Sequence, residues 1–419
     1  MLQNRGGHSV LFSPFCKSYK LSNTGYRFSL FFPLPYRVAI VLVAGVWGWG
    51  LNLHYLSAVK IDVPALIRYP SRSSIHQVPV YRSTYHLATL LSIPLAISLL
   101  IFWFVTHGSA QRVIEWEIIP QSYLFLFFVL LIFPLHKLSR NGRHRFAVAL
   151  KRVSVGGLAE TQDGKFGDII LADVLTSYSK ILGDLFVSTC MFFSSEASST
   201  SIPNRECGGQ IAVPLLICIP SAIRLRQCLI EFGRVRKGNR NIDGWGGQHL
   251  ANALKYASAF PVILLTTLQR NHDPNSYTIS AENLYRLWVL SALINSLFAF
   301  YWDVAKDWDL TLFSALNHPN DPEYPFGLRR HRYFYANEMY YSAIIIDLIL
   351  RFTWISRLST RLDWVNDIEG GVFVLMLLEV VRRWIWIFVR VETEWVRNNR
   401  GPAPDDILLG EFNGKIDED

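Results

Sequence analysis

The sequence predicts an all-α polytopic membrane protein, a helical bundle of nine or ten transmembrane helices. Of its 419 residues 51% are hydrophobic and 14% are aromatic, and the mean hydropathy is positive at +0.22. Apolar stretches of about 20 residues recur along the chain, which is the length that a helix needs to cross a bilayer core about 30 Å thick. These observations indicate that lipid surrounds most of the chain.

Nine stretches approach the length of a membrane span. They run approximately over residues 36–55, 85–105, 118–136, 168–193, 210–230, 249–268, 283–302, 336–357 and 369–390. The first three and the seventh are strongly apolar, whereas the fourth, sixth, eighth and ninth carry ionisable residues. Lipid cannot solvate charged side chains. We therefore expect those four segments to turn their charges toward the bundle interior or a wet cavity.

The chain is expected to form one membrane domain at residues 36–400, between an N-terminal tail (1–35) and an acidic cytosolic C-terminal tail (401–419). Basic residues gather in the loops after spans one, three, five and seven, which places the C-terminus in the cytosol by the positive-inside rule. Nine spans then place the N-terminus outside or in a lumen. The basic N-terminal stretch opposes this, so either that tail is translocated or one span is miscounted. Because no removable signal peptide is apparent, the first span is expected to act as the targeting signal.

Charge and cysteine content argue against several classes of partner. The net charge of +8 could indicate a nucleic-acid binder. The basic residues, however, lie in short stretches between apolar runs, which is a pattern of membrane orientation. The five cysteines form no CxxC pair and no Cys/His cluster with metal spacing. We therefore expect the lipid bilayer as a partner, and no nucleic acid, disulfide framework, zinc site or other cofactor.

The fourth span carries a polar stripe. Read as one helix, it places on a single face Asp173, Thr176 or Ser177, Lys180 and Asp184. Such a stripe either lines a wet pathway or grips another helix through hydrogen bonds. Two acids and a lysine are costly to bury in lipid, which favours the pathway.

Charges also mark the sixth and seventh spans. Lys255 lies about a turn and a half into the sixth span, three residues after Asn252, so that an amide and an ammonium can converge. The alternative is a structural ion pair of Lys255 with Asp173 or Asp303. Asp303 and Asp307 lie one turn apart at the end of the seventh span. Without a third acid or a histidine they are a weak metal signal, and we interpret them as counter-ions for arginines.

The eighth and ninth spans supply those arginines. Arg351 lies one turn after an aspartate and shares its face with Trp354, and the ninth span contains Glu379, Arg382 and Arg383. A guanidinium offers a rigid fork of donors that matches the oxygens of a tetrahedral oxyanion. These arginines are therefore the strongest candidates for binding an anion.

Arg390, eight residues after Arg382 in the ninth span, has a simpler interpretation. It lies near the predicted end of that span, where arginine side chains commonly reach the lipid headgroups. A position among the headgroups is therefore the stronger expectation for Arg390.

Six segments in this order resemble the EXS domain, which is found in eukaryotic phosphate exporters of the retrovirus-receptor type and in fungal Golgi proteins named for defective retention of ER lumenal proteins. The resemblance covers roughly residues 36–400. The segments are LADVLTSY from Leu171, RQCL from Arg226, HLANALKY from His249, WDVAKDWDL from Trp302, LRFTW from Leu350 and EVVRRWIWIFVRVETE from Glu379.

The resemblance implies roles for particular residues. The counterparts of five of them line a phosphate path: Asp173, Lys255, Arg351, Arg382 and Arg383. The counterpart of Trp354 helps to gate that path. The exporters usually have DQLNSL where this chain has DVLTSY. Thr176 thus replaces an amide ligand, and the site is expected to hold phosphate differently.

The resemblance also implies a physiological role. The first span begins near residue 36, so the chain looks like the fungal Golgi branch, which lacks the N-terminal SPX domain that senses inositol polyphosphates. That branch implies a multi-pass Golgi membrane protein, cycling with the ER, that returns lumenal inorganic phosphate from glycosylation to the cytosol. Loss of the branch disturbs the retention of glycosyltransferases and ER lumenal proteins.

Two other functions are weighed against phosphate transport. In the first, the chain is a trafficking adaptor whose cytosolic tail and loops bind Golgi sorting machinery and glycosyltransferases, and the buried charges are structural. In the second, it is a membrane-bound glycosyl- or phosphotransferase. We rank the enzyme last and expect no catalysis, because no acidic metal motif accompanies a nucleophile or base. A homodimer is an arrangement that the residues leave open.

Overall fold

The computed structural model describes residues 28–68, 79–132, 140–160, 163–194, 198–238, 246–271, 280–310, 325–334, 336–358 and 369–399. Within these ranges the chain is helical and contains no strand, which confirms the predicted all-α class. Most of the predicted N-terminal tail, and all of the acidic tail at 401–419, lie outside the described residues.

Every stretch predicted as a span contains helix. The α-helices are α2 (Leu34–Ala58), α3 (Val63–Leu66), α4 (Val80–Thr106), α5 (Ala110–Glu115), α6 (Ile118–Ile132), α7 (Arg140–Ser154), α8 (Lys165–Ser177), α9 (Ser179–Phe193), α10 (Ala212–Lys237), α12 (Gly247–Ala257), α13 (Ala259–Arg270), α14 (Ala281–Trp302), α15 (Asn337–Arg351) and α17 (Glu369–Asn399). Shorter turns of other helix types are η2 (Asp303–Asp307), η3 (Pro325–Gly327) and η4 (Thr353–Leu358). Five described segments are long and apolar enough to cross a membrane by themselves: Leu34–Ala58, Val80–Thr106, Ala110–Leu131, Ala212–Lys237 and Ala281–Asp307.

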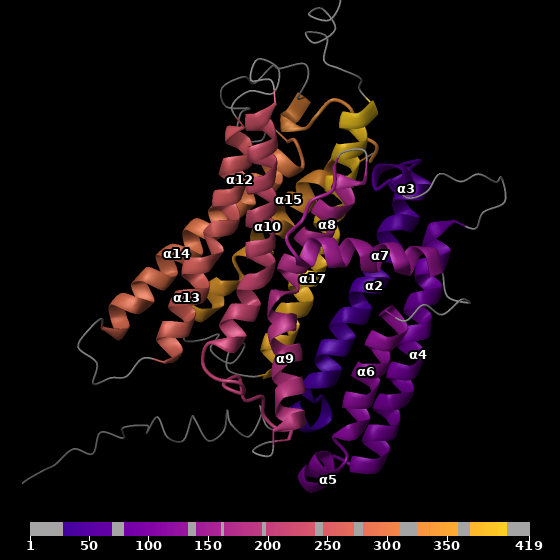
Figure 1. Cartoon of the computed structure of the whole chain (residues 1–419), viewed down its shortest axis with the longest axis vertical. Helices are drawn as coiled ribbons and strands as arrows, with labels where there is room; N and C mark the ends of the chain where they lie inside the picture. Colours follow the sequence, from indigo (N-terminus) through magenta and orange to yellow (C-terminus); the bar gives the residue numbers. More distant parts are fainter. Residues whose placement is uncertain are drawn as a thin grey trace, which may run out of the picture.

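The helices form an elongated bundle with α17 near its centre (Figure 1). Helices α2, α4 and α6 pack together on one side, and α12, α13 and α14 lie on the other. Helix α17 packs against α2, α8 and α15, while α10 packs against α8, α9 and α12. Helices α8, α10 and α17 therefore join the two sides, and their side chains can meet in the interior.

The bundle turns large apolar side chains outward. Phe104, Phe125 and Ile349 are 77%, 72% and 60% exposed on helices whose opposite faces pack into the bundle. Many other large apolar side chains of the described helices are exposed as well, and proteins surrounded by water rarely expose so much apolar surface. On helices that satisfy their own backbone hydrogen bonds it is the surface that lipid requires.

One predicted span is interrupted where its polar stripe lies. The chain leaves the helical path at Tyr178, between α8 and α9, where the Tyr178 amide donates to the Leu175 carbonyl. Two side-chain hydroxyls donate hydrogen bonds to nearby backbone carbonyls: Thr176 Oγ1 donates to Asp173 O at 2.7 Å, and Ser179 Oγ donates to Thr176 O at 2.7 Å. Such side-chain bonds compete with the helical ladder. The span expected as one helix is therefore two helices. The two aspartates of its expected polar face are buried, whereas Lys180 is exposed.

Other spans are interrupted at similar places. The sixth breaks at Ser258, between α12 and α13, and its hydroxyl donates to the carbonyl of Lys255 at 2.7 Å. The seventh ends in the π-helical turn η2, which begins at Asp303. Single π turns inside membrane or globular helices are frequent at functional sites. These interruptions fall beside the charged residues that the sequence singled out.

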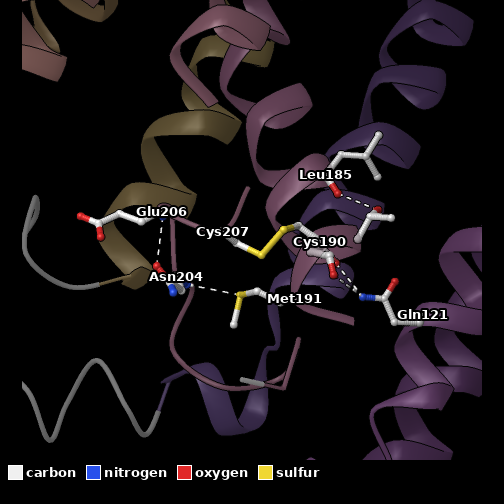
Figure 2. Close-up of a disulfide and its surroundings, with 9 residues drawn as sticks. Gln121, Leu185, Cys190, Met191, Asn204, Glu206 and Cys207 are labelled. Atoms are coloured by element: carbon white, nitrogen blue, oxygen red, sulfur yellow. Dashed lines mark hydrogen bonds between the residues drawn. A yellow bond between two sulfur atoms is a disulfide. The ribbon is translucent and has the colours of Figure 1, made fainter. Parts of the chain in front are cut away.

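A disulfide joins Cys190, near the end of α9, to Cys207 in the loop before α10 (Figure 2). The expectation of no disulfide was wrong, because the loop folds back on α9 and brings the two Cα atoms to 6.0 Å, although the sequence spacing of 17 matches no motif. In the same loop the backbone nitrogen of Asn204 lies 3.3 Å from Met191 Sδ. Disulfides persist in oxidising compartments, which supports the non-cytosolic side predicted for this loop.

A buried ion pair fixes the segment before α15. Arg329 and Glu392 are each 0% exposed and form a salt bridge. Arg329 Nη1 also donates to Trp308 O at 2.5 Å and to Thr393 Oγ1 at 2.6 Å. Glu392 Oε1 accepts from Tyr340 Oη at 2.6 Å. The pair thus ties η2, the 325–334 segment and α15 to the end of α17.

Helix α2 closely approaches Tyr178, the residue between α8 and α9, at Gly45. A Cβ built there would lie 1.8 Å from Tyr178 Oη and 3.0 Å from Cζ of the same ring. We expect Gly45→Ala to displace this buried ring and lower the free energy of unfolding by about 1–3 kcal/mol, as overpacking does. Thermal unfolding in detergent micelles measures the change.

Gly233 in α10 is the matched control, because a Cβ there meets nothing within 4 Å. Gly233→Ala should gain up to about 1 kcal/mol from helix propensity. Adding Tyr178→Phe to Gly45→Ala removes the nearest atom and should restore part of the loss. Equal shifts for the two glycine variants would contradict the close contact between α2 and Tyr178.

Candidate anion-binding site

Ionisable side chains from α8, α10, α12, η2, α15 and α17 meet inside the bundle. We call them the central cluster, and it consists of the basic residues Arg224, Lys255, Arg351, Arg382 and Arg383 and the acidic residues Asp173, Asp303, Asp307, Asp347 and Glu379. Seven of the ten are buried, and Asp307, Arg351 and Glu379 are partly buried. The structure therefore gathers the charged residues proposed on the last four spans together with Asp173, and it adds Arg224 and Asp347. Of the polar stripe, Lys180 is exposed and Asp184 lies near Arg205 instead.

Asp303 is shared by three cations. It pairs with Arg351, its Oδ2 lies 3.5 Å from Arg382 Nη1, and its Oδ1 lies 3.6 Å from Lys255 Nζ. The π-helical turn that starts at Asp303 also brings Asp307 Oδ2 to 3.7 Å from the same ammonium. Of the two structural partners considered for Lys255, the structure selects Asp303. The two aspartates are thus counter-ions, as the sequence suggested.

Arg382 is held by carboxylates on two sides. Its Nε and Nη2 donate to Glu379 at 2.9 and 2.6 Å, and its Nη1 donates to Asp347 Oδ1 at 2.9 Å. Asp347 Oδ2 also accepts from Arg351 Nε at 3.0 Å. A guanidinium with this many charge-assisted bonds is fixed in place. Arg382 therefore organises the cluster.

Arg383, the next residue, has different partners. Its Nε donates to Ser177 Oγ at 2.9 Å and its Nη2 donates to Thr176 Oγ1 at 3.1 Å, while its guanidinium lies 4.5 Å from the ring centre of Trp386. In the described part of the chain no carboxylate lies within 4 Å of this guanidinium. The substituted Thr176 is thus in direct contact with an arginine. Within the central cluster, Arg383 is thus the cation whose hydrogen-bond partners are neutral hydroxyls.

Asp173 pairs with a residue that the sequence did not single out. Its Oδ1 accepts from Arg224 Nε at 2.7 Å and from Tyr256 Oη at 2.5 Å. Asp173 therefore pairs directly with Arg224, whereas Lys255 pairs with Asp303. The segment noted in that span began at Arg226, which bonds to Val155 O outside the cluster. An arginine within an apolar span was the signal that would have identified Arg224.

Trp354 lies beside the cluster in η4. Its Nε1 donates to Ser296 Oγ at 2.9 Å, and its ring meets that of Trp288 edge-on at 5.9 Å. Ser296 Oγ in turn lies 3.4 Å from the carbonyl oxygen of Arg351. Trp354 therefore connects α14 to the end of α15, directly after a cation of the cluster.

Arg390 does not reach lipid headgroups. It is 9% exposed, donates to Glu394 Oε2 at 2.9 Å and lies 3.9 Å from Asp307 Oδ1. The expectation of a headgroup contact was wrong because α17 continues to Asn399, so that Arg390 remains inside the bundle. Arg390 extends the line of charges from the central cluster along α17.

The central cluster is balanced in charge, with five basic and five acidic groups. Removing these groups from water is costly unless each is paired or hydrogen-bonded. An anion that enters must replace a carboxylate or bind a cation that has no carboxylate partner. Arg383 meets the second condition, and Arg351 and Lys255 meet the first through Asp303. This arrangement suits a tetrahedral oxyanion, whose oxygens can accept from several of these donors together.

Comparisons with known proteins agree on one family. A family model described as the EXS family matches residues 32–396. The chain is 30% identical over 371 residues to Protein ERD1 homolog 1 of Schizosaccharomyces pombe, a match that covers 88% of this chain and 92% of that protein. It is 27% identical to Protein ERD1 of Kluyveromyces lactis, with 90% and 98% covered. It is 28% identical to Solute carrier family 53 member 1 of Homo sapiens, with 87% of this chain and 50% of that protein covered.

Proposed function

The chain belongs to the EXS family of polytopic membrane proteins, and from this membership and the central cluster we propose that it carries inorganic phosphate across the Golgi membrane. The phosphate is the lumenal by-product of glycosylation, and the carrier returns it to the cytosol. Its activity thereby supports the retention of Golgi glycosyltransferases and ER lumenal proteins. The similarity to a protein named as a solute carrier supports transport, and the similarity to ERD1 proteins supports the assignment to that branch.

The observation that carries the proposal is the state of Arg383. Its buried guanidinium is held by Ser177 and Thr176, and no described carboxylate lies within 4 Å of it. Such an arginine is costly to maintain in a membrane protein unless an anion uses it. Phosphate can accept charge-assisted hydrogen bonds from the donors of this guanidinium fork.

Asp303 acts in this proposal as the restraint of the empty state. It holds Arg351 and Lys255 while no anion is present. A phosphate that reaches Arg383 competes with Asp303 for the other two cations, because its oxygens offer the same charge-assisted bonds. Exchange between carboxylate and phosphate keeps Arg351 and Lys255 paired in both states. Trp354, which follows Arg351 by three residues, is the gating residue of this proposal.

Phosphate flux in proteoliposomes tests the function directly. We expect the purified chain to release radiolabelled phosphate down an imposed phosphate gradient, with a rate that saturates with phosphate concentration. Protein-free liposomes give the background rate, and repeating the assay with an imposed pH gradient shows whether protons move with phosphate. A flux equal to that of protein-free liposomes under both conditions would rule out phosphate transport.

A further inference from the structure

A second group of charges lies away from the central cluster, at the end of the bundle where α17 begins. It consists of Arg37 in α2, Asp184 in α9, Arg205 in the loop before α10 and Glu369 in α17, and we call it the outer cluster. Arg37 and Asp184 are buried, and Arg205 and Glu369 are partly buried. None of the four has a role in the function proposed above.

Two arginines of the outer cluster converge on one carboxylate. Arg37 Nη1 donates to Glu369 Oε2 at 2.6 Å, while Arg205 Nη1 and Nη2 donate to Oε1 and Oε2 at 2.9 and 3.2 Å. Arg37 is further fixed by the Phe32 carbonyl at 2.7 Å and by Ser29 Oγ at 2.8 Å. Two forks aimed at one carboxylate form a frame that equally fits the oxygens of a phosphate.

The outer cluster lies in line with the central cluster. Glu369 precedes Glu379 by ten residues on α17, a helical rise of about 15 Å. Tyr178, Ile181 and Met376 lie between the two levels and belong to one apolar core. The interior along α9 and α17 is therefore layered: a charged level, an apolar level and a second charged level.

The loop that carries Arg205 is held in place. The disulfide at Cys207 ties it to α9, and Asn204 contacts the same helix through Met191 (Figure 2). Arg205 has 27% of its side chain exposed, against 1% for Arg37, so it is the outer of the two arginines. Burial lowers the pKa of Arg205, but the carboxylates of Asp184 and Glu369 outweigh burial and raise it, so the guanidinium stays charged.

We propose that Arg37 and Arg205 form a second oxyanion-binding site, which receives phosphate at the non-cytosolic mouth before it passes the apolar level to the central cluster. Phosphate binds both guanidiniums in place of Glu369, and Glu369 returns when phosphate leaves. Asp184, 3.7 Å from Arg205 Nε, holds that arginine while Glu369 is displaced. This inference rests on the proposed transport of phosphate.

Two variants that leave the backbone intact test the site through opposite effects. Arg205→Gln removes one fork and should raise the half-saturating phosphate concentration about tenfold, the effect of losing a charge-assisted hydrogen bond. Glu369→Gln removes the competing carboxylate charge with little change in shape and should lower the same concentration. A group with only a structural role would impair transport in the same direction in both variants.

The assay uses proteoliposomes with phosphate supplied at the end that carries Arg205. Glu369 and Asn399 lie at opposite ends of α17, so vesicles that protect a C-terminal affinity tag present the Arg205 end outward. Arg270→Gln is the matched control, because Arg270 ends α13, is exposed, and lies outside both clusters. We expect this control to keep the half-saturating concentration of the wild type.

Each outcome decides between the two proposals. Opposite shifts in Arg205→Gln and Glu369→Gln support the second site. Shifts in the same direction, or none, overturn it while wild-type flux keeps the proposed function intact. A wild type without flux above protein-free liposomes overturns the proposed function and this inference together.

Discussion

Arg383→Ala is expected to reduce phosphate flux by at least about tenfold while leaving the unfolding temperature of the protein close to that of the wild type. The arginine donates to Ser177 and Thr176 and has no described carboxylate within 4 Å. Its loss removes charge-assisted bonds to phosphate, each worth roughly 1.5–3 kcal/mol. The substitution also leaves no buried carboxylate without its salt-bridge partner. Flux in proteoliposomes and thermal unfolding in detergent measure the two effects.

The neighbouring arginine is the matched control. Arg382→Ala leaves Asp347 and Glu379 without the guanidinium that bonds to both. Breaking a buried pair from one side costs about 3–5 kcal/mol, so this variant should unfold at a clearly lower temperature. Flux in Arg383→Ala within twofold of the wild type, at equal protein incorporation, would sink the assignment of Arg383 to the phosphate site.

Glu392→Ala is expected to destabilise the fold strongly, by about 3–5 kcal/mol, because it leaves the fully buried Arg329 without its counter-charge. The carboxylate also accepts from the Tyr333 amide at 2.5 Å and from Tyr340 Oη at 2.6 Å, and both donors would lose that partner. Unfolding followed by a fluorescent thiol probe or by light scattering in detergent measures the loss.

Glu282→Ala provides the comparison for Glu392→Ala. Glu282 forms a 2.6 Å salt bridge with Arg286, but both side chains are about 70% exposed. Exposed pairs contribute little, from 0 to about 1 kcal/mol. If the two glutamate variants unfold at the same temperature, the segment before α15 is not held by the buried pair.

Much of the fold was accessible from the sequence, because the length and apolar content of a span are local properties. The interruptions at Tyr178 and Ser258 were not, since hydroxyl side chains there compete with the helical ladder and no change in hydrophobicity marks the place. The disulfide between Cys190 and Cys207 was missed for a related reason. Its formation depends on how the loop returns to α9.

Part of the candidate site could be predicted from the sequence, because burying a charged side chain in lipid has a high free-energy cost. That argument identified Asp303, Arg351 and Arg382 without knowledge of the fold. It could not assign partners, because pairing is set by the packing of helices far apart in the sequence. Arg224 is 51 residues from Asp173 and still provides its salt bridge. The outer cluster was missed as well, since Arg37 and Glu369 are 332 residues apart.

The equal numbers of acidic and basic groups in the central cluster bear on how a membrane potential acts on the protein. Moving one elementary charge through 100 mV involves about 2.3 kcal/mol. With its ten groups ionised the empty cluster carries no net charge, so voltage does little work when the unloaded protein changes conformation. In the proposed transport cycle the bound phosphate supplies the net charge on which the membrane potential acts. The potential therefore affects the conformational change of the phosphate-loaded protein, and it has little effect on the return of the empty protein.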